Sequence, residues 1–202
     1  PYIGTGWYRN IFDIENFNKK DKKVNLLFDG AMSEARVYVN GKEAIFWPFG
    51  YNSFHCDVTD LLNSDGKSNT IAVRLENKPE SSRWYPGAGL YRNVHVIVTN
   101  EVHVPVWGTY ITTPFVSKDY ASVNLKSEIE NSNGKDIRIV TEIRDASNSI
   151  VSQKDNTQKI NHGKPFEQNF IVNNPRLWSP ESPYLYKAVS KIYIDGKQID
   201  EY

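Results

Sequence analysis

The chain has 202 residues, a length that suits one large or two ordinary domains. It carries 24 Lys and Arg against 24 Asp and Glu, and so lacks the basic excess that is usual in nucleic-acid-binding proteins. The longest apolar runs are short, as in AIFWPF at 44–49, and exclude a membrane-spanning segment, while the single cysteine, Cys56, excludes an intrachain disulfide framework.

Strand-like alternation of apolar and polar residues runs along most of the chain. It is clearest in four segments: 23–29, 70–77, 93–99 and 121–130. Such alternation predicts strands with one buried face, so that Val94, Val96 and Val98 are expected to point into a core. The stretch DVTDLLNSDG at 57–66 favours one helical turn at most. We therefore expect an all-β protein.

Three dipeptides with turn chemistry lie between β-rich runs: Asn40-Gly41, Asn133-Gly134 and Asp195-Gly196. A type I′ turn needs positive φ at both central residues, which Asn, Asp and Gly tolerate best. The three dipeptides predict three β-hairpins with two-residue loops, and hence antiparallel strands.

A change of composition near residues 99–104 predicts two domains. The tryptophan-rich and glycine-rich loops lie before this point, whereas residues 104–202 are richer in Ile, Lys, Asn and Ser. About seven short strands are expected in the second half, which fits an immunoglobulin-like sandwich without the cysteine pair of antibody domains. Because the chain starts at Pro1 and stops just after a strand-like stretch, we expect it to be a piece of a longer protein, hereafter the parent protein.

Catalytic and metal-binding patterns are weak in this sequence. No GxSxG elbow and no phosphate-binding glycine loop occurs, and Cys56 is expected to be a buried structural thiol. The dipeptide Asn100-Glu101 has no second carboxylate tied to it, as a glycosidase pair would require. The histidines are scattered without metal-ligand spacing, and ordinary strand positions are expected for them: His55, His95, His103 and His162.

Aromatic residues in two connections are the clearest candidates for ligand contact. FWPFGYNSF at 46–54 and SSRWYPGAGLYRNV at 81–94 mix aromatic rings with Arg, Asn and Ser. Sugar rings stack their C–H faces on such side chains, and their hydroxyls bond to the polar groups. The alternative is that both loops fold on themselves, with Trp84 and Tyr85 plugging the sandwich and Arg83 or Arg92 paired with a carboxylate.

The chain resembles the N-terminal part of glycoside hydrolase family 2 enzymes, above all their β-galactosidases. The resemblance lies in GWYRNIF (6–12), VYVNGK (37–42), GYNSFHCDVTDLL (50–62), NTIAVRLEN (69–77), SRWYPGAGLYRNVHV (82–96), VWGTYITTP (106–114) and RLWSPESPYLY (176–186). It implies a galactose-binding-like jelly-roll sandwich, the sugar-binding domain, at 1–101, followed by an immunoglobulin-like β-sandwich at 102–202. It also implies a TIM barrel beyond Tyr202 that holds both catalytic glutamates of a retaining enzyme. No catalytic residue, metal site or cofactor is then expected in this chain.

The resemblance also assigns a place to the aromatic loops. In the family, the loop at 81–94 leaves the jelly roll on the side that faces the barrel and helps to wall the catalytic pocket. It implies a pocket rim made of Ser81, Ser82, Arg83, Trp84 and Tyr85. Three further residues are candidates for contact with sugar or barrel: Trp47, Tyr51 and Asn52. The family usually has strands before GWYR, and without them the first strand here is expected to be an exposed sheet edge.

The function implied is that of a non-catalytic region that supports the barrel and lines its pocket. Its expected partners are the barrel and a β-galactoside-type carbohydrate, with no nucleic acid and no membrane, in a parent protein that forms homo-oligomers. Related enzymes act on β-glucuronides and β-mannosides, but the sequence WYPGAGLYRNV favours a galactosidase. Export to the periplasm or the medium is favoured over the cytoplasm. Two alternatives stay open: an autonomous carbohydrate-binding module or lectin, and a structural protein of tandem sandwiches.

Overall fold

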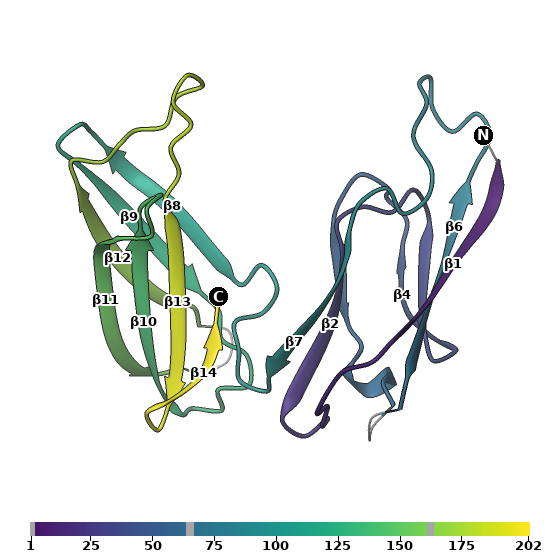
Figure 1. The fold of residues 1–202 in the computed structure, drawn as a ribbon, viewed down its shortest axis with the longest axis horizontal. Helices are drawn as coiled ribbons and strands as arrows, with labels where there is room; N and C mark the ends of the chain where they lie inside the picture. The colour runs from purple at the N-terminus through teal and green to yellow at the C-terminus, as the bar shows by residue number, and fades with distance from the viewer. Residues whose placement is uncertain (1–2, 64–66, 161–163) are drawn as a thin grey trace. The chain divides into compact units, whose positions relative to one another are not determined.

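A computed structural model of the chain describes residues 3–63, 67–160 and 164–202, so that His162 lies outside the described residues. The predicted all-β fold is confirmed, and the chain divides into two compact units, residues 1–99 and 100–202 (Figure 1). The described part contains no helix that is long and apolar enough to cross a membrane.

Unit 1 is built of two sheets with a core between them. The four-stranded sheet has the order β1 (Gly4–Phe12), β6 (Asn69–Asn77), β3 (Ala35–Val39) and β4 (Lys42–Trp47). The three-stranded sheet has the order β5 (Phe54–Asp57), β2 (Lys22–Phe28) and β7 (Val94–Asn100). The strand β1 lies at a sheet edge, as expected, because its only neighbour in the described sheet is β6.

The core of unit 1 follows the predicted alternation. Val24, Leu26 and Phe28 of β2 are completely buried, and the side chains between them are only partly covered. Cys56 of β5 is buried in the same core, as predicted. Burial, with a smaller effect from the charge of Asp57, raises the pKa of the Cys56 thiol to about 11, so the thiol stays protonated at neutral pH.

The valine row of β7 is exposed, contrary to the prediction. Val94, Val96 and Val98 all belong to the exposed residues of unit 1. The alternation itself is present, but β7 is an edge strand of its sheet, and a cavity of about 270 Å³ separates it from the edge strand β1 of the other sheet. Alternation therefore predicted the strand correctly, whereas burial also needed an opposing sheet that covers this edge.

Unit 2 is a sandwich of seven described strands, in agreement with the expected number. One sheet has the order β11 (Ile150–Lys159), β10 (Asp136–Arg144), β13 (Lys187–Ile194) and β14 (Lys197–Glu201). The other has the order β12 (Phe166–Asn173), β9 (Tyr120–Ser127) and β8 (Thr109–Val116). The most deeply buried large side chains of unit 2 are Leu125, Ile137, Ile139, Ile160, Phe166, Phe170 and Ile192.

Two of the three predicted hairpins are confirmed. Asn40-Gly41 joins β3 to β4, and Asp195-Gly196 joins β13 to β14, with positive φ at all four residues. Asn133-Gly134 also forms a turn, closed by a 2.9 Å bond from the Lys135 amide to the Ser132 carbonyl. Its flanking strands β9 and β10 belong to different sheets, however, so the hairpin prediction is wrong there. Turn chemistry sets φ but does not decide which strands pair.

The helical turn predicted near residue 60 is present as the 3₁₀ turn η1 (Thr59–Leu61). The described histidines lie on or beside strands. His95 of β7 contacts Asp29 with 3.0 Å between Nε2 and Oδ2, and the buried His103 forms a β-bridge with Glu130.

Candidate functional site

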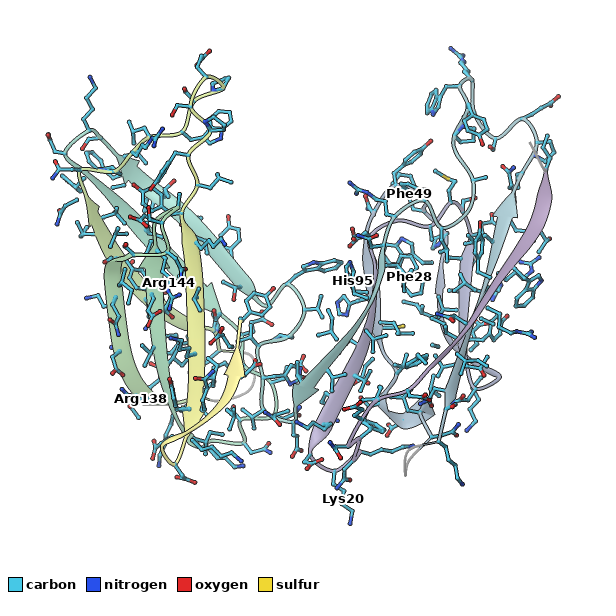
Figure 2. The ribbon with its side chains drawn as sticks, viewed as in Figure 1. Lys20, Phe28, Phe49, His95, Arg138 and Arg144 are labelled. Atoms are coloured by element: carbon cyan, nitrogen blue, oxygen red, sulfur yellow. The ribbon has the colours of Figure 1, made fainter. Side chains whose placement is uncertain are left out.

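The candidate site is built from two connections of unit 1. The long connection between β6 and β7, residues 78–93, is here called the rim loop, and the connection between β4 and β5, residues 48–53, is called the brace. Phe49 of the brace lies at the end of unit 1 from which the rim loop extends (Figure 2).

The rim loop is tied to the sandwich at its C-terminal half. Gly89 and Met32 exchange two backbone hydrogen bonds of 3.0 Å, and the Asp29 amide donates to the Asn93 carbonyl over 3.0 Å. Gly89 has a φ of 89°, which side-chain-bearing residues rarely adopt. These bonds hold the loop close to the sheet while residues 81–86 remain at its outer end.

Tyr91 links the rim loop to the brace. Its hydroxyl donates a 2.7 Å hydrogen bond to the Gly50 carbonyl, and its ring crosses Gly30 so closely that a Cβ there would lie 2.5 Å from the ring. A side chain at Gly30 would therefore displace Tyr91 and break its bond with Gly50. Sequence reasoning missed this role of Tyr91, because nothing in the sequence connects it with Gly30.

An aromatic cluster joins the outer ends of the rim loop and the brace. The indole Nε1 of Trp84 donates to the Tyr51 hydroxyl over 3.1 Å, and that hydroxyl donates to the Pro86 carbonyl over 3.2 Å. Phe49 packs edge-on against Tyr51 with ring centroids 5.6 Å apart. Since these contacts use the polar edge of Trp84, the face of its indole is left open to solvent.

The rings at the tip of the rim loop do not plug the sandwich. Trp84 is 65% exposed and Tyr85 is 70% exposed, which removes the alternative that they fill the end of unit 1. Arg83 and Arg92 are exposed too, and among the described residues no carboxylate lies within ion-pair distance of either. The loop thus presents aromatic faces and guanidinium donors that the unit itself does not use.

The other predicted site residues separate into two groups. Ser81 of the rim loop and Asn52 of the brace are exposed, and the Ser82 hydroxyl bonds to the carbonyl of Trp84 in the aromatic cluster. Trp47 is placed differently: it is half-buried, packs on the core and stacks on Phe54 at 5.5 Å. The structure therefore brings Tyr51 to the rim loop and does not bring Trp47 there.

A cavity of about 290 Å³ lies beside Tyr85. Its walls include Tyr8, Leu75 and Asn77, together with Gly4, Gly6 and Gly89, which have no side chain to fill the space. Aromatic faces beside the polar side chain of Asn77 suit a sugar ring, which offers C–H faces and hydroxyls. The sequence did not indicate this cavity, because the glycines that line it do not belong to one motif.

The rim loop carries side chains suited to ligand contact, but not the pair of carboxyl groups that glycoside hydrolysis needs. Its sequence contains a single carboxylate, Glu80. Glycoside hydrolysis needs two carboxyl groups, about 5–5.5 Å apart in retaining enzymes and about 6.5–9.5 Å apart in inverting ones. The chemistry available here is stacking, hydrogen bonding and the shaping of a pocket.

Comparison with known proteins places both units in one family. The family described as "Glycosyl hydrolases family 2, sugar binding domain" matches residues 1–100, and "Glycosyl hydrolases family 2" matches residues 102–202. A β-galactosidase of Bacteroides ovatus is 34% identical over 98% of the chain and 24% of its own length. A β-glucuronidase of Formosa agariphila is 32% identical over 98% of the chain and 23% of its own length.

Solved structures agree with these relatives. A glycosyl hydrolase family 2 member from Bacteroides cellulosilyticus superimposes with a TM-score of 0.91 at 35% identity, over 98% of this chain and 26% of that one. A β-glycosidase from Bacteroides vulgatus gives a TM-score of 0.87 at 33% identity, over 98% of this chain and 25% of that one. The chain thus spans about a quarter of the length of the proteins that it matches.

Proposed function

The chain belongs to glycosyl hydrolase family 2, and from this premise we propose that it is the non-catalytic N-terminal region of a retaining β-glycosidase of the β-galactosidase type. In this proposal residues 1–101 are the sugar-binding jelly roll and residues 102–202 are the immunoglobulin-like sandwich. The acid/base and the nucleophile are glutamates of a TIM barrel beyond Tyr202.

The rim loop carries the proposal. Its exposed Trp84 is braced by Tyr51, and the loop is anchored through Gly89, so Trp84 is held in place without being buried. A fixed aromatic surface can orient a sugar ring toward carboxylates that another domain supplies, because stacking defines the plane of the ring. No carboxylate among the described residues lies within ion-pair distance of Arg83, so its guanidinium can donate hydrogen bonds to the hydroxyls of the substrate.

The proposed substrate is a β-galactoside-type carbohydrate. This proposal rests on the amino-acid sequence of the rim loop and on the β-galactosidases among the relatives. A β-glucuronide is the second candidate, because other relatives are described as β-glucuronidases and Arg83 could pair with a uronate carboxylate. Assembly of the parent protein into a homo-oligomer is part of the same proposal.

Substitution of the rim loop in the parent protein tests the proposal. We expect Trp84→Ala and Arg83→Ala each to lower kcat/KM about tenfold or more, a loss of about 1.4 kcal/mol of transition-state stabilisation or greater, with an unchanged melting temperature. Trp7→Ala is the matched control, because Trp7 is similarly exposed but lies on β1 outside the rim loop. Wild-type kcat/KM in both rim variants would remove the rim loop from the site.

The alternative of an autonomous carbohydrate-binding module makes a different prediction. In that case the 202-residue chain alone would bind galactose at a saturable site with millimolar or tighter affinity. Calorimetric titration of the chain with galactose distinguishes the two functions. We expect no saturable heat, because the rim loop of the proposed enzyme forms only one wall of a pocket that the barrel completes.

A further inference from the structure

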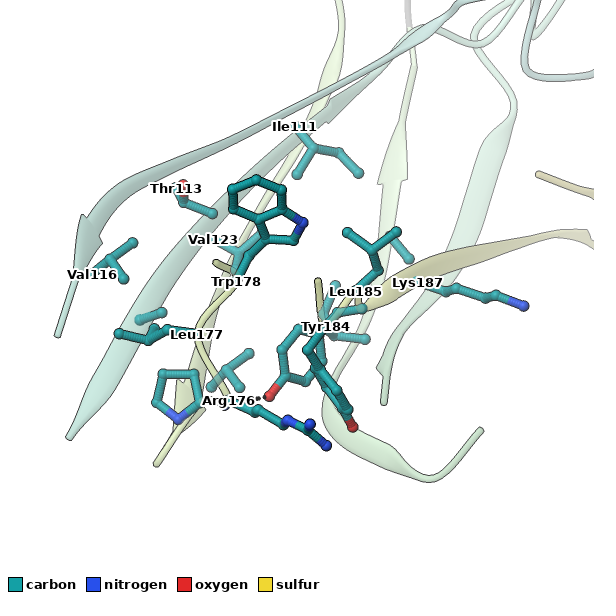
Figure 3. A pocket seen from close by; sticks show the side chains of 16 residues that line it. Ile111, Thr113, Val116, Val123, Arg176, Leu177, Trp178, Tyr184, Leu185 and Lys187 are labelled. Carbon is teal, nitrogen blue, oxygen red and sulfur yellow. Dashed lines mark hydrogen bonds between the residues drawn. The ribbon is translucent and has the colours of Figure 1, made fainter. Parts of the chain in front are cut away.

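A second surface, in unit 2, is apolar and open. The connection between β12 and β13, residues 174–186, arches beside a cavity of about 490 Å³ (Figure 3). We call this surface the Trp178 groove, and its apolar lining includes Ile111, Val116, Val123, Leu177, Trp178 and Leu185. None of these side chains belongs to the rim loop.

The connection that forms the groove is held in shape by polar contacts of its own. The Arg176 amide donates to the Tyr186 hydroxyl over 2.8 Å, and the Arg176 guanidinium lies 4.6 Å from the centroid of the Tyr184 ring and donates to the Ser182 hydroxyl over 3.2 Å. The Tyr184 hydroxyl accepts a 3.1 Å bond from the Ala146 amide. The backbone is therefore fixed without any need to bury Trp178 or Leu185.

Most apolar side chains that line the groove remain largely in water. Trp178 is 58% exposed and Leu185 is 69% exposed, and Ile111 and Val116 of β8 beside them are exposed as well. Large apolar side chains are more stable when they are buried than when they are left in water. A fixed loop that leaves several such side chains exposed around one cavity is typical of a surface that another protein covers.

We propose that the Trp178 groove is the surface on which the catalytic domain of the parent protein docks. This inference rests on the proposed function, because it takes the missing partner to be that domain. The chain spans 24% of the B. ovatus relative and 26% of the B. cellulosilyticus structure, so about three quarters of such a protein lies outside the 202 residues. In the proposed function that remainder contains the catalytic domain.

The chemistry of the groove specifies what it receives. Its floor is aliphatic, with Val123 and Val172, and two cations, Arg176 and Lys187, lie at its border. The complementary surface is an apolar side chain that projects from the catalytic domain beside a carboxylate. A second copy of the chain fits less well, because a two-fold interface repeats the same patch and would bring these cations toward each other.

Hydroxyl-radical footprinting of Trp178 tests the docking. The oxidation rate of Trp178 is measured by mass spectrometry in the 202-residue chain and in the intact parent protein. We expect rapid oxidation in the chain and a rate at least fivefold lower in the parent protein. Equal rates would overturn the proposal. Protection in the chain alone, either at raised protein concentration or on addition of galactose, would also overturn it, in favour of a second copy or a sugar.

Matched variants provide the second readout. Trp178→Ala and Leu185→Ala are expected to leave the melting temperature of the 202-residue chain unchanged and to lower that of the parent protein by several degrees. The control is Ile150→Ala, an exposed apolar residue of β11 outside the groove, which should be neutral in both proteins. Equal effects in chain and parent protein would contradict docking.

Hydrolysis of a β-galactoside and of a β-glucuronide by the same parent sample separates the two proposals. An active parent protein with unprotected Trp178 overturns the docking alone. A parent protein that is inactive on both glycosides but has a protected Trp178 overturns the glycosidase function and leaves the groove as a domain interface.

Discussion

Replacing Phe28 by alanine is expected to lower the free energy of unfolding of unit 1 by about 3–5 kcal/mol. Phe28 is completely buried on β2 and stacks on Phe54 with ring centroids 4.7 Å apart. Trp47 also stacks on Phe54, with ring centroids 5.5 Å apart. Alanine removes the ring and leaves a cavity that the surrounding strands can fill only in part. Calorimetric or urea unfolding of the 202-residue chain measures the loss.

The control for this substitution is Phe46→Ala. Phe46 is an exposed residue of β4 whose ring lies under Arg36, with 4.4 Å from the guanidinium carbon to the ring centroid. Its loss should change the free energy of unfolding by less than about 1 kcal/mol. Similar losses at Phe28 and Phe46 would contradict the core described for unit 1.

The Phe28 stack also has a consequence for the site. Trp47 and Phe54 are the residues on either side of the brace, so the stack fixes both ends of the segment that holds Tyr51. Because Tyr51 accepts the hydrogen bond of Trp84, a loosened stack should also loosen the rim loop. In the parent protein we therefore expect Phe28→Ala to lower kcat/KM even at temperatures where unit 1 remains folded.

Glu142→Gln is expected to lower the free energy of unfolding of unit 2 by about 2–3 kcal/mol at neutral pH. The side chain of Glu142 is only 9% exposed, and its two oxygens accept hydrogen bonds from Arg144 Nε at 2.8 Å and Lys191 Nζ at 3.2 Å. Glutamine leaves both cations without their carboxylate. The loss stays below that of a fully buried pair because the side chains of Arg144 and Lys191 are 21% and 23% exposed.

The effect of Glu142→Gln should depend on pH. Hydrogen bonds from Arg144, opposed by burial and aided by Lys191, hold the pKa of the Glu142 carboxyl below its ordinary value of 4.5. A carboxyl whose pKa is lowered by folding stabilises the protein fully above the unfolded pKa, and this contribution is lost as the pH falls through the folded pKa. The urea midpoints of wild type and variant should therefore differ at pH 7, and the difference should shrink as the pH falls below 4.5.

The control for the charge network is Asp155→Asn. Asp155 bonds to Arg138, with Nε 2.9 Å from Oδ1, but both side chains of this pair are more than 40% exposed. Solvent screens such a pair, so its loss should be small. If Asp155→Asn and Glu142→Gln had equal effects at pH 7, burial would not be the reason for the stability of the Glu142 network.

The sequence predicted strands and turns well because both depend on local chemistry. The alternation in β2 and the Asn-Gly turn between β3 and β4 needed no knowledge of the rest of the fold. Burial of Val96 and the pairing of strands around Asn133-Gly134 depend on which sheet lies opposite, and there the predictions failed. Local patterns do not contain that information.

The aromatic composition of the two connections made them candidates for the site, but the contacts between the connections were not predicted from the sequence. Aromatic residues indicated the rim loop, and Trp84 and Tyr85 are exposed there. The sequence could not separate Tyr51, which braces Trp84, from Trp47, which packs on the core, because both lie in one short aromatic stretch. The resemblance to family 2 supplied the expected position of the loop, since composition alone says nothing of a neighbouring barrel.

The most direct test of the account is an activity assay of the purified 202-residue chain beside the parent protein. We expect the parent protein to hydrolyse a chromogenic β-galactoside or β-glucuronide and the folded chain to release no more product than buffer, because in the proposed function both reacting carboxylates belong to the barrel. Turnover of either glycoside by the chain alone, persisting after contaminating enzymes are removed, would contradict the division between a framing region and a catalytic barrel.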